Sequence, residues 1–145
     1  MGFNLSIWRL VMIKKLLNLK KMQTDQKILE RTKMQNRVEE LEAEIMLTQH
    51  QMATTSVNKH GAISDFAILQ IHKNTMKAHI VKLNVIKNRL IQKIDKANEE
   101  LKELLKESEQ FSYLVQEQKK IELKELLKRE EEATAEYMQS KYVAS

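Results

Sequence analysis

The chain has 145 residues, of which 31% are charged and 5% aromatic, and it carries a formal net charge of +5 with no proline, no cysteine and two glycines. The absence of cysteine excludes a disulfide framework, and the near absence of proline and glycine is typical of almost uninterrupted helix. Two isolated glycines cannot form a glycine-rich phosphate loop, and no apolar window is long enough to predict a membrane-spanning helix.

The N-terminal segment combines apolar and basic residues. Arg9 interrupts it, Lys14 and Lys15 follow, and no Ala-x-Ala-like site is present, so we do not expect a cleaved signal peptide. This mixture suits a helix that lies on a membrane surface. We favour the alternative, that these residues are the first turns of a longer helix, because three of them keep its heptad frame. They are Leu10, Ile13 and Leu17.

We expect a first helix over about residues 4–53. From residue 34 to residue 52 the sequence repeats at alternating steps of three and four, which is the spacing of a coiled-coil seam. Its members are Met34, Val38, Leu41, Ile45, Thr48 and Met52. Extended backward, the frame meets Lys20, Thr24, Lys27 and Arg31. We therefore expect the packing face to rotate or loosen over those four polar positions.

We expect a turn over about residues 54–63. Thr54, Thr55 and Val57 are β-branched and form helix poorly. Gly61 can adopt a positive φ angle, and Ser64 is a suitable N-cap for a following helix. A turn near residue 58 would place residue i of the first helix roughly opposite residue 116 − i of the second.

The second helix, expected over about residues 64–140, has the clearest heptad pattern. Twelve of 17 successive seam positions are apolar, which predicts a long coiled-coil helix. The positions are Phe66, Leu69, Lys73, Met76, Ile80, Leu83, Lys87, Leu90, Ile94, Ala97, Leu101, Leu104, Ser108, Phe111, Val115, Gln118 and Glu122. This helix is longer than the first, so roughly 25 C-terminal residues should project past the N-terminus.

The sequence therefore predicts an all-α fold, a long antiparallel two-helix coiled-coil hairpin with an overhanging C-terminal helix, in one domain over residues 1–145. We expect no enzyme, cofactor or small-molecule substrate, because a two-helix hairpin offers no desolvated cleft. His72 and His79 lie two helical turns apart, about 10 Å, which is too far to share a metal ion. Twenty of the 25 bases are lysine and no nucleic-acid-binding signature is present, so we expect no nucleic-acid partner.

Four features of the chain together resemble a known family. They are the segment from Ile13 to Lys21, the turn around Gly61 followed by Ser64, the heptad run from Met76 to Leu104, and the Glu117-Gln118-Lys119-Lys120 stretch. Over nearly its whole length the chain resembles the general chaperone of the flagellar type III export apparatus. It is also similar to the stalk proteins of virulence type III secretion systems.

The resemblance implies a cytoplasmic protein at the inner face of the cell membrane that binds a hexameric export ATPase and a membrane export-gate protein, and that also hands on export substrate chaperones. We expect residues near the turn to contact the gate: His72, Lys73 and Met76. We expect a stripe on the C-terminal arm to contact the ATPase ring: Leu123, Leu126, Ala133 and Tyr137. The alternative is a structural or tethering coiled coil that acts through self-association or a coiled-coil partner.

Overall fold

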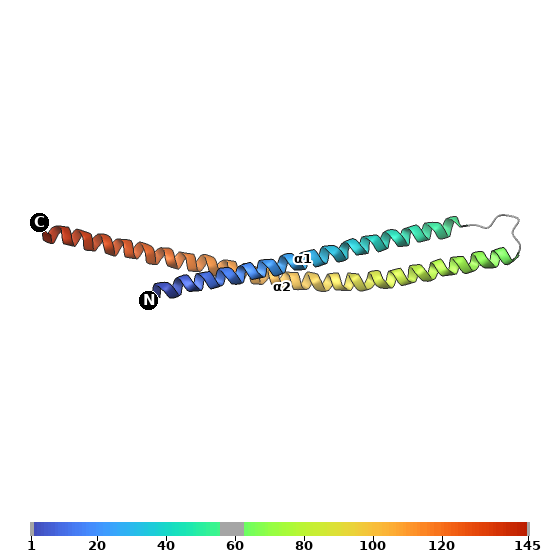
Figure 1. Ribbon diagram of the computed structural model, residues 1–145, viewed down its shortest axis with the longest axis horizontal. Coiled ribbons are helices and arrows are strands. Elements are labelled where there is room, and N and C mark those ends of the chain that lie inside the picture. Colours follow the sequence, from blue (N-terminus) through green and yellow to red (C-terminus); the bar gives the residue numbers. More distant parts are fainter. Residues whose placement is uncertain (1, 56–62, 145) are drawn as a thin grey trace. The chain divides into compact units, whose positions relative to one another are not determined.

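The computed structural model describes residues 2–55 and 63–144, and within these ranges it contains two α-helices (Figure 1). Helix α1 runs from Gly2 to Thr54 and helix α2 from Ile63 to Ala144. The two helices pack against each other as an antiparallel hairpin, which confirms the predicted all-α fold. Gly61 lies outside the described residues. Because α2 already begins at Ile63, Ser64 lies within its first turn instead of preceding it.

Two threonines mark the end of α1. The hydroxyl of Thr54 donates a hydrogen bond to the carbonyl oxygen of His50, at 2.9 Å. The backbone N–H of Thr55 donates to the carbonyl oxygen of Gln51, also at 2.9 Å. The last four carbonyl groups of a helix lack partners inside it, and the bond from Thr55 satisfies one of them, that of Gln51, where β-branched residues stop favouring helix.

The contacts of the chain form two units, which we describe separately. One consists of Met1–Asp25 and Lys102–Ser145, and the other of Gln26–Leu101. The core of the second unit is centred on Leu41, whose exposed fraction is 0%, and on Ile45 and Leu83. Three half-buried apolar residues pack around them: Ile80, Ile86 and Leu90.

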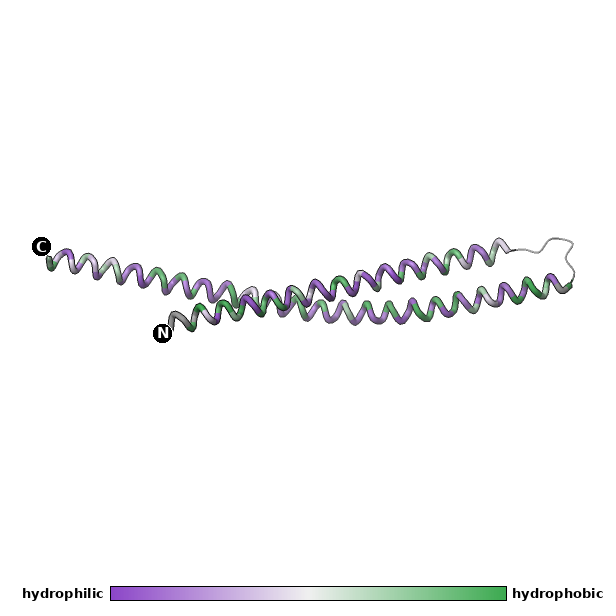
Figure 2. The backbone as a smooth tube through the Cα atoms, viewed as in Figure 1, coloured by the Kyte–Doolittle hydropathy of each residue, from purple (hydrophilic) through white to green (hydrophobic). Residues whose placement is uncertain are grey.

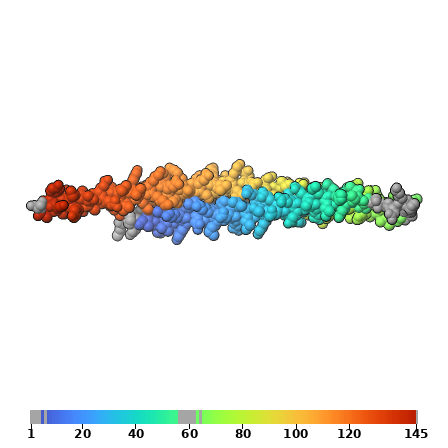
Figure 3. Space-filling model, turned by 90° about the horizontal axis from the view of Figure 1, so that it is seen from above, coloured from blue at the N-terminus to red at the C-terminus, as the bar shows by residue number. Residues whose placement is uncertain are grey.

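In the first unit, the N-terminal part of α1 lies beside the C-terminal part of α2 (Figure 3). Lys20 pairs with Glu107, so residue i faces roughly residue 127 − i, and the start of α1 faces residues near Glu125. The described residues of α2 from 126 to 144 are all exposed. The predicted overhang is therefore present, but it begins at about Leu126 and is shorter than the 25 residues we expected.

The heptad frame predicted for α2 matches the burial of its side chains. Every one of the 17 seam positions is buried or half-buried except Phe66. The prediction for α1 was wrong in one respect, because the frame does not rotate or loosen at its four polar positions. Thr24 is buried, and the three charged members are half-buried: Lys20, Lys27 and Arg31. Polar partners explain this outcome, as described below.

The predicted pairing of the two helices was also wrong. Within Gln26–Leu101, Lys27 pairs with Glu100 and Glu44 pairs with His79, so residue i faces roughly residue 127 − i to 123 − i, and not 116 − i. By the same relation, the residues of α2 that face Thr54 lie between positions 69 and 73. The first turns of α2 therefore begin before its pairing with α1 begins, which accounts for the exposure of Phe66.

Apolar and polar residues alternate at short intervals along both helices (Figure 2). Neither described helix is apolar over a stretch long enough to cross a membrane. Among the described residues, every buried side chain lies at a seam position, so most of each helix remains available for contacts with other molecules.

Candidate partner-binding surfaces

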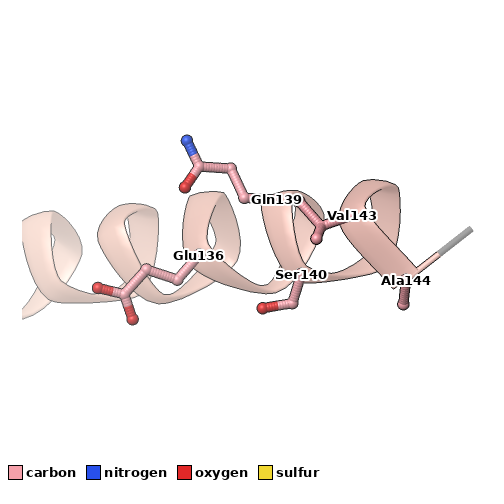
Figure 4. Close-up of a pocket in the computed structure, with 5 residues that line it drawn as sticks. All are labelled: Glu136, Gln139, Ser140, Val143 and Ala144. Carbon is pink, nitrogen blue, oxygen red and sulfur yellow. The ribbon is translucent and has the colours of Figure 1, made fainter.

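The pockets found along the described residues are shallow. One of them lies near the C-terminus and is lined by residues of a single helix: Glu136, Gln139, Ser140, Val143 and Ala144. Their side chains point to different sides of the helix and do not converge on a common point (Figure 4). A depression of this kind gives a substrate no desolvated surroundings, so it has none of the features of a catalytic site.

Acidic and histidine side chains do not gather into a metal site either. Among residues 2–55 and 63–144, no group of three or more His, Cys, Asp or Glu side chains could hold a metal ion. His79, one of the histidines considered from the sequence, instead contacts Glu44 across the hairpin, with 3.1 Å between Nε2 and Oε1. This histidine therefore joins the two helices.

The C-terminal arm, residues 126–144, carries exposed apolar side chains. The four predicted contact residues all lie exposed on this arm or directly before it: Leu123, Leu126, Ala133 and Tyr137. Further exposed apolar residues that we did not single out lie on the same segment: Leu127, Met138, Tyr142 and Val143. The arm is therefore an exposed helix with an apolar surface of its own.

The apolar stripe of the arm does not continue the seam of the hairpin. The seam frame, extended past Glu122, falls on charged residues, namely Glu125, Arg129, Glu132 and Glu136. The stripe lies one position further along the chain, and a step of one residue rotates it by about 100° around the helix axis from the seam. A partner of the arm must approach from this new direction.

The predicted gate-binding residues near the turn differ in exposure. His72 is exposed, Lys73 is half-buried, and Met76 is a seam residue with an exposed fraction of 8%. The apolar surface at this end comes instead from residues that we did not predict: Ile63, Phe66, Ile68 and Ile71. Ile63 is 89% exposed. Only the pairing of the helices could have identified them, because it leaves the first turns of α2 without a facing partner.

Charged residues at seam positions of Gln26–Leu101 are held by partners on the opposite helix. The Nζ atom of Lys27 lies 2.6 Å from a carboxylate oxygen of Glu100 and 3.2 Å from one of Glu30. The hydrogen bond to Glu100, followed by that to Glu30, raises the pKa of Lys27, and the hydrogen bond from Lys27 lowers the pKa of Glu100. Arg31 donates to the side-chain oxygen of Asn98 at 3.1 Å. The long aliphatic stems of the bases fill the seam while their charged ends reach these partners.

The other unit contains a similar arrangement. The Nζ atom of Lys20 lies 2.5 Å from a carboxylate oxygen of Glu107. The hydroxyl of buried Thr24 donates to the carbonyl oxygen of Lys20 at 2.7 Å, and this bond to its own helix satisfies the hydroxyl without a partner on α2. Polar residues at these seam positions are thus compatible with close packing.

The exposed surfaces described above are the C-terminal arm, the first turns of α2 and the outer faces of the helices, and none of them has the form of a catalytic or metal site among the described residues. No family model, no curated protein and no solved structure matches the chain.

Proposed function

We propose that the chain is a non-enzymatic stalk and chaperone component of a bacterial flagellar type III protein export apparatus. In this role it binds the export ATPase ring through its C-terminal arm and the membrane export gate through the first turns of α2. The proposal rests on the sequence resemblance described above. The observation that supports it most directly is the arm, a helix that extends past its partner with its apolar stripe exposed.

The arm supports a ring-binding role because of its geometry. A single helix of 19 residues is about 28 Å long and roughly 10 Å wide, and by itself it has only marginal stability in water. Several ring subunits could surround it and cover Leu126 and Tyr137, which are 50% and 67% exposed. The acidic and basic residues between them would then face the polar rim of each contact.

The test uses ATP hydrolysis by the purified hexameric export ATPase. A chain truncated before Leu126 retains the whole paired seam, so it should stay helical by circular dichroism but lose stimulation of hydrolysis. The full-length variant Leu123→Gln/Leu126→Gln/Tyr137→Gln should reduce stimulation at least tenfold, because it removes three exposed apolar contacts. A matched control is Leu105→Gln/Tyr113→Gln/Leu114→Gln, which changes equally exposed residues of α2 outside the arm. Unchanged stimulation by the truncated chain would rule out ring binding through the arm.

The gate-binding end is tested separately. Because Met76 is buried, its replacement would disturb the seam, whereas His72 and Ile68 are exposed and can be changed without disturbing it. The variant His72→Ala/Ile68→Ser should weaken binding to the cytoplasmic domain of the gate protein, measured by calorimetry. The control variant Lys77→Ala/Val81→Ser alters exposed residues two turns further along α2. Equal affinities for both variants would exclude a gate contact at this end.

One feature also favours the alternative function, a structural coiled coil that acts by self-association. The arm stripe is narrow and heptad-spaced, so the arm of a second copy could cover it. Sedimentation equilibrium of the purified chain distinguishes the two functions. A stable oligomer that the arm variant dissociates, together with no effect on the ATPase, would support the alternative.

A further inference from the structure

The N-terminal third of α1 has a second apolar face in addition to its seam. Five exposed residues recur on it at steps of three and four, with Lys15 at the one remaining position: Leu5, Trp8, Met12, Leu19 and Met22. Trp8, the only tryptophan of the chain, is 60% exposed. These residues occupy the outer side of α1, whereas Leu10, Ile13 and Leu17 occupy the half-buried seam that packs on α2.

This outer face is broad. Val11 and Leu16, which flank the stripe on its two sides, are also exposed. A coiled-coil seam is narrow and continues over at least three or four heptads. Here the apolar spacing weakens after Met22, since the next positions of the same frame are Gln26, Leu29, Lys33 and Asn36, of which only Leu29 is apolar. The face is therefore too short and too wide for a second helix to be its preferred partner.

The charge of the N-terminal third of α1 indicates what kind of partner covers this outer face. Lys15 lies within the stripe, Arg9, Lys14 and Lys21 are exposed on the same turns of α1, and the first acidic residue of the chain is Asp25. The part of α2 that faces this segment, residues 102–125, is nearly neutral, with five bases against six acids. It also lies on the far side of α1, and the axes of two packed helices are about 8–10 Å apart, a distance comparable to the Debye length in physiological salt. The charged groups that an anionic surface would meet on this segment are thus all basic.

We propose that this face docks the protein on a membrane surface that contains anionic phospholipid. An apolar face flanked by lysine and arginine is the arrangement of helices that lie in the interfacial region of a bilayer. The indole of Trp8 suits the boundary between headgroups and acyl chains, where one part of the ring is apolar and its N–H is hydrated. The seam on the other side keeps α2 in place, so the hairpin need not open. The proposal concerns a different face from the ring-binding arm and stands independently of the export function.

The first test measures binding of the full chain to vesicles through the fluorescence of Trp8. Phosphatidylcholine vesicles containing phosphatidylglycerol should shift its emission to shorter wavelength, and brominated lipids should quench it. Each base close to an anionic surface strengthens partitioning roughly fivefold. The variant Lys14→Gln/Lys15→Gln/Lys21→Gln should therefore bind these vesicles roughly a hundredfold more weakly. Its matched control, Lys33→Gln/Lys77→Gln/Lys82→Gln, changes exposed lysines elsewhere and should retain binding.

The second test concerns the apolar stripe. The variant Met12→Gln/Leu19→Gln keeps Trp8 as the probe and leaves the seam intact, and it should lower partitioning about tenfold or more, because two apolar side chains no longer enter the bilayer. The control variant Ile28→Gln/Met46→Gln makes the same change at exposed positions outside the frame of the stripe. Co-sedimentation with the same vesicles provides a readout independent of fluorescence.

Three outcomes would overturn the proposal. The first is that Trp8 emission does not respond to anionic vesicles. The second is that the stripe or lysine variant binds as tightly as its control. The third is that wild type forms a dimer, the variant Met12→Gln/Leu19→Gln dissociates it, and neither protein binds vesicles, in which case the face joins two copies of the chain.

Discussion

Replacing Leu41 by alanine should measure how much of the hairpin's stability depends on the seam. Leu41 is the one fully buried large side chain among the described residues, and it packs with Ile45 and Leu83. A buried leucine replaced by alanine loses about 2–5 kcal/mol, which combines the lost burial and the cavity left behind. Neighbours contact this seam from only two helices and can partly close the gap, so we expect about 3 kcal/mol.

A loss of this size is large for a molecule with a narrow core. Small domains are commonly stable by about 5–15 kcal/mol, and a single seam places this hairpin towards the lower end. With a urea m-value of about 2 kcal/mol per molar, the unfolding midpoint should fall by about 1.5 M. Leu47→Ala is the matched control, because Leu47 lies on the same helix and is 57% exposed. Its cost should stay below about 0.5 kcal/mol.

The measurement is urea unfolding followed by far-ultraviolet circular dichroism, with the m-value compared between variants. If Leu41→Ala and Leu47→Ala shifted the midpoint equally, the helices would not pack through this seam in solution. A lower m-value in wild type than in Leu41→Ala would also contradict the reasoning, because it would mean that the native chain buries less surface than the hairpin requires.

Three further predictions follow from the pairing of the helices. Spin labels at Glu44 and His79 should report a shorter distance than labels at Glu44 and Ile71, since eight residues of helix displace the second label by about 12 Å. A shorter distance between Glu44 and Ile71 would mean that the helices pair as the sequence predicted, with residue i opposite residue 116 − i. Thr48→Val should raise stability by about 1 kcal/mol in urea unfolding, because the buried hydroxyl bonds only to its own helix and a methyl group would fill the seam; a loss of stability would show that the hydroxyl has another role. The hydrogen bond from Lys27 lowers the pKa of Glu100 from its ordinary value of 4.5. The pair therefore stabilises the fold fully above pH 4.5, and this stabilisation is lost as the pH falls through the lowered pKa. Glu100→Gln should therefore be less stable than wild type at neutral pH and equally stable in strong acid, whereas a constant difference at all pH values would contradict the assignment.

The hairpin and its seam could be predicted because they depend on a local property of the sequence. A helix carries its side chains at fixed angles, so the steps of three and four from Leu69 to Val115 determine which face is apolar without reference to any other residue. Burial follows this frame along α2 with the exception of Phe66. The overhang was also predictable, since it follows from the unequal lengths of the two helices.

The pairing of the helices was not predictable in the same way. It depends on how the chain crosses from one helix to the other, and the number of residues in a turn does not specify where the second helix meets the first. The exposure of Ile63 and Ile71 could not be foreseen for this reason. The prediction for the polar seam positions of α1 was wrong because packing there depends on distant partners. Lys27 and Arg31 contact Glu100 and Asn98, which lie about 70 residues away in the sequence.

These cross-helix polar pairs supply the information that a heptad pattern lacks. A shift of one helix by seven residues leaves every apolar seam position on the seam, so apolar packing alone distinguishes poorly between such registers. In Gln26–Leu101, a shift in one direction would move Lys27 from Glu100 to a position opposite Lys93, and a shift in the other would place Glu44 opposite Ile86. Either change separates half-buried charges from their partners, which costs more than the pairs contribute when formed. The charged seam residues therefore lower the apolar content of the core, and in exchange they make one pairing of the two helices more stable than its neighbours.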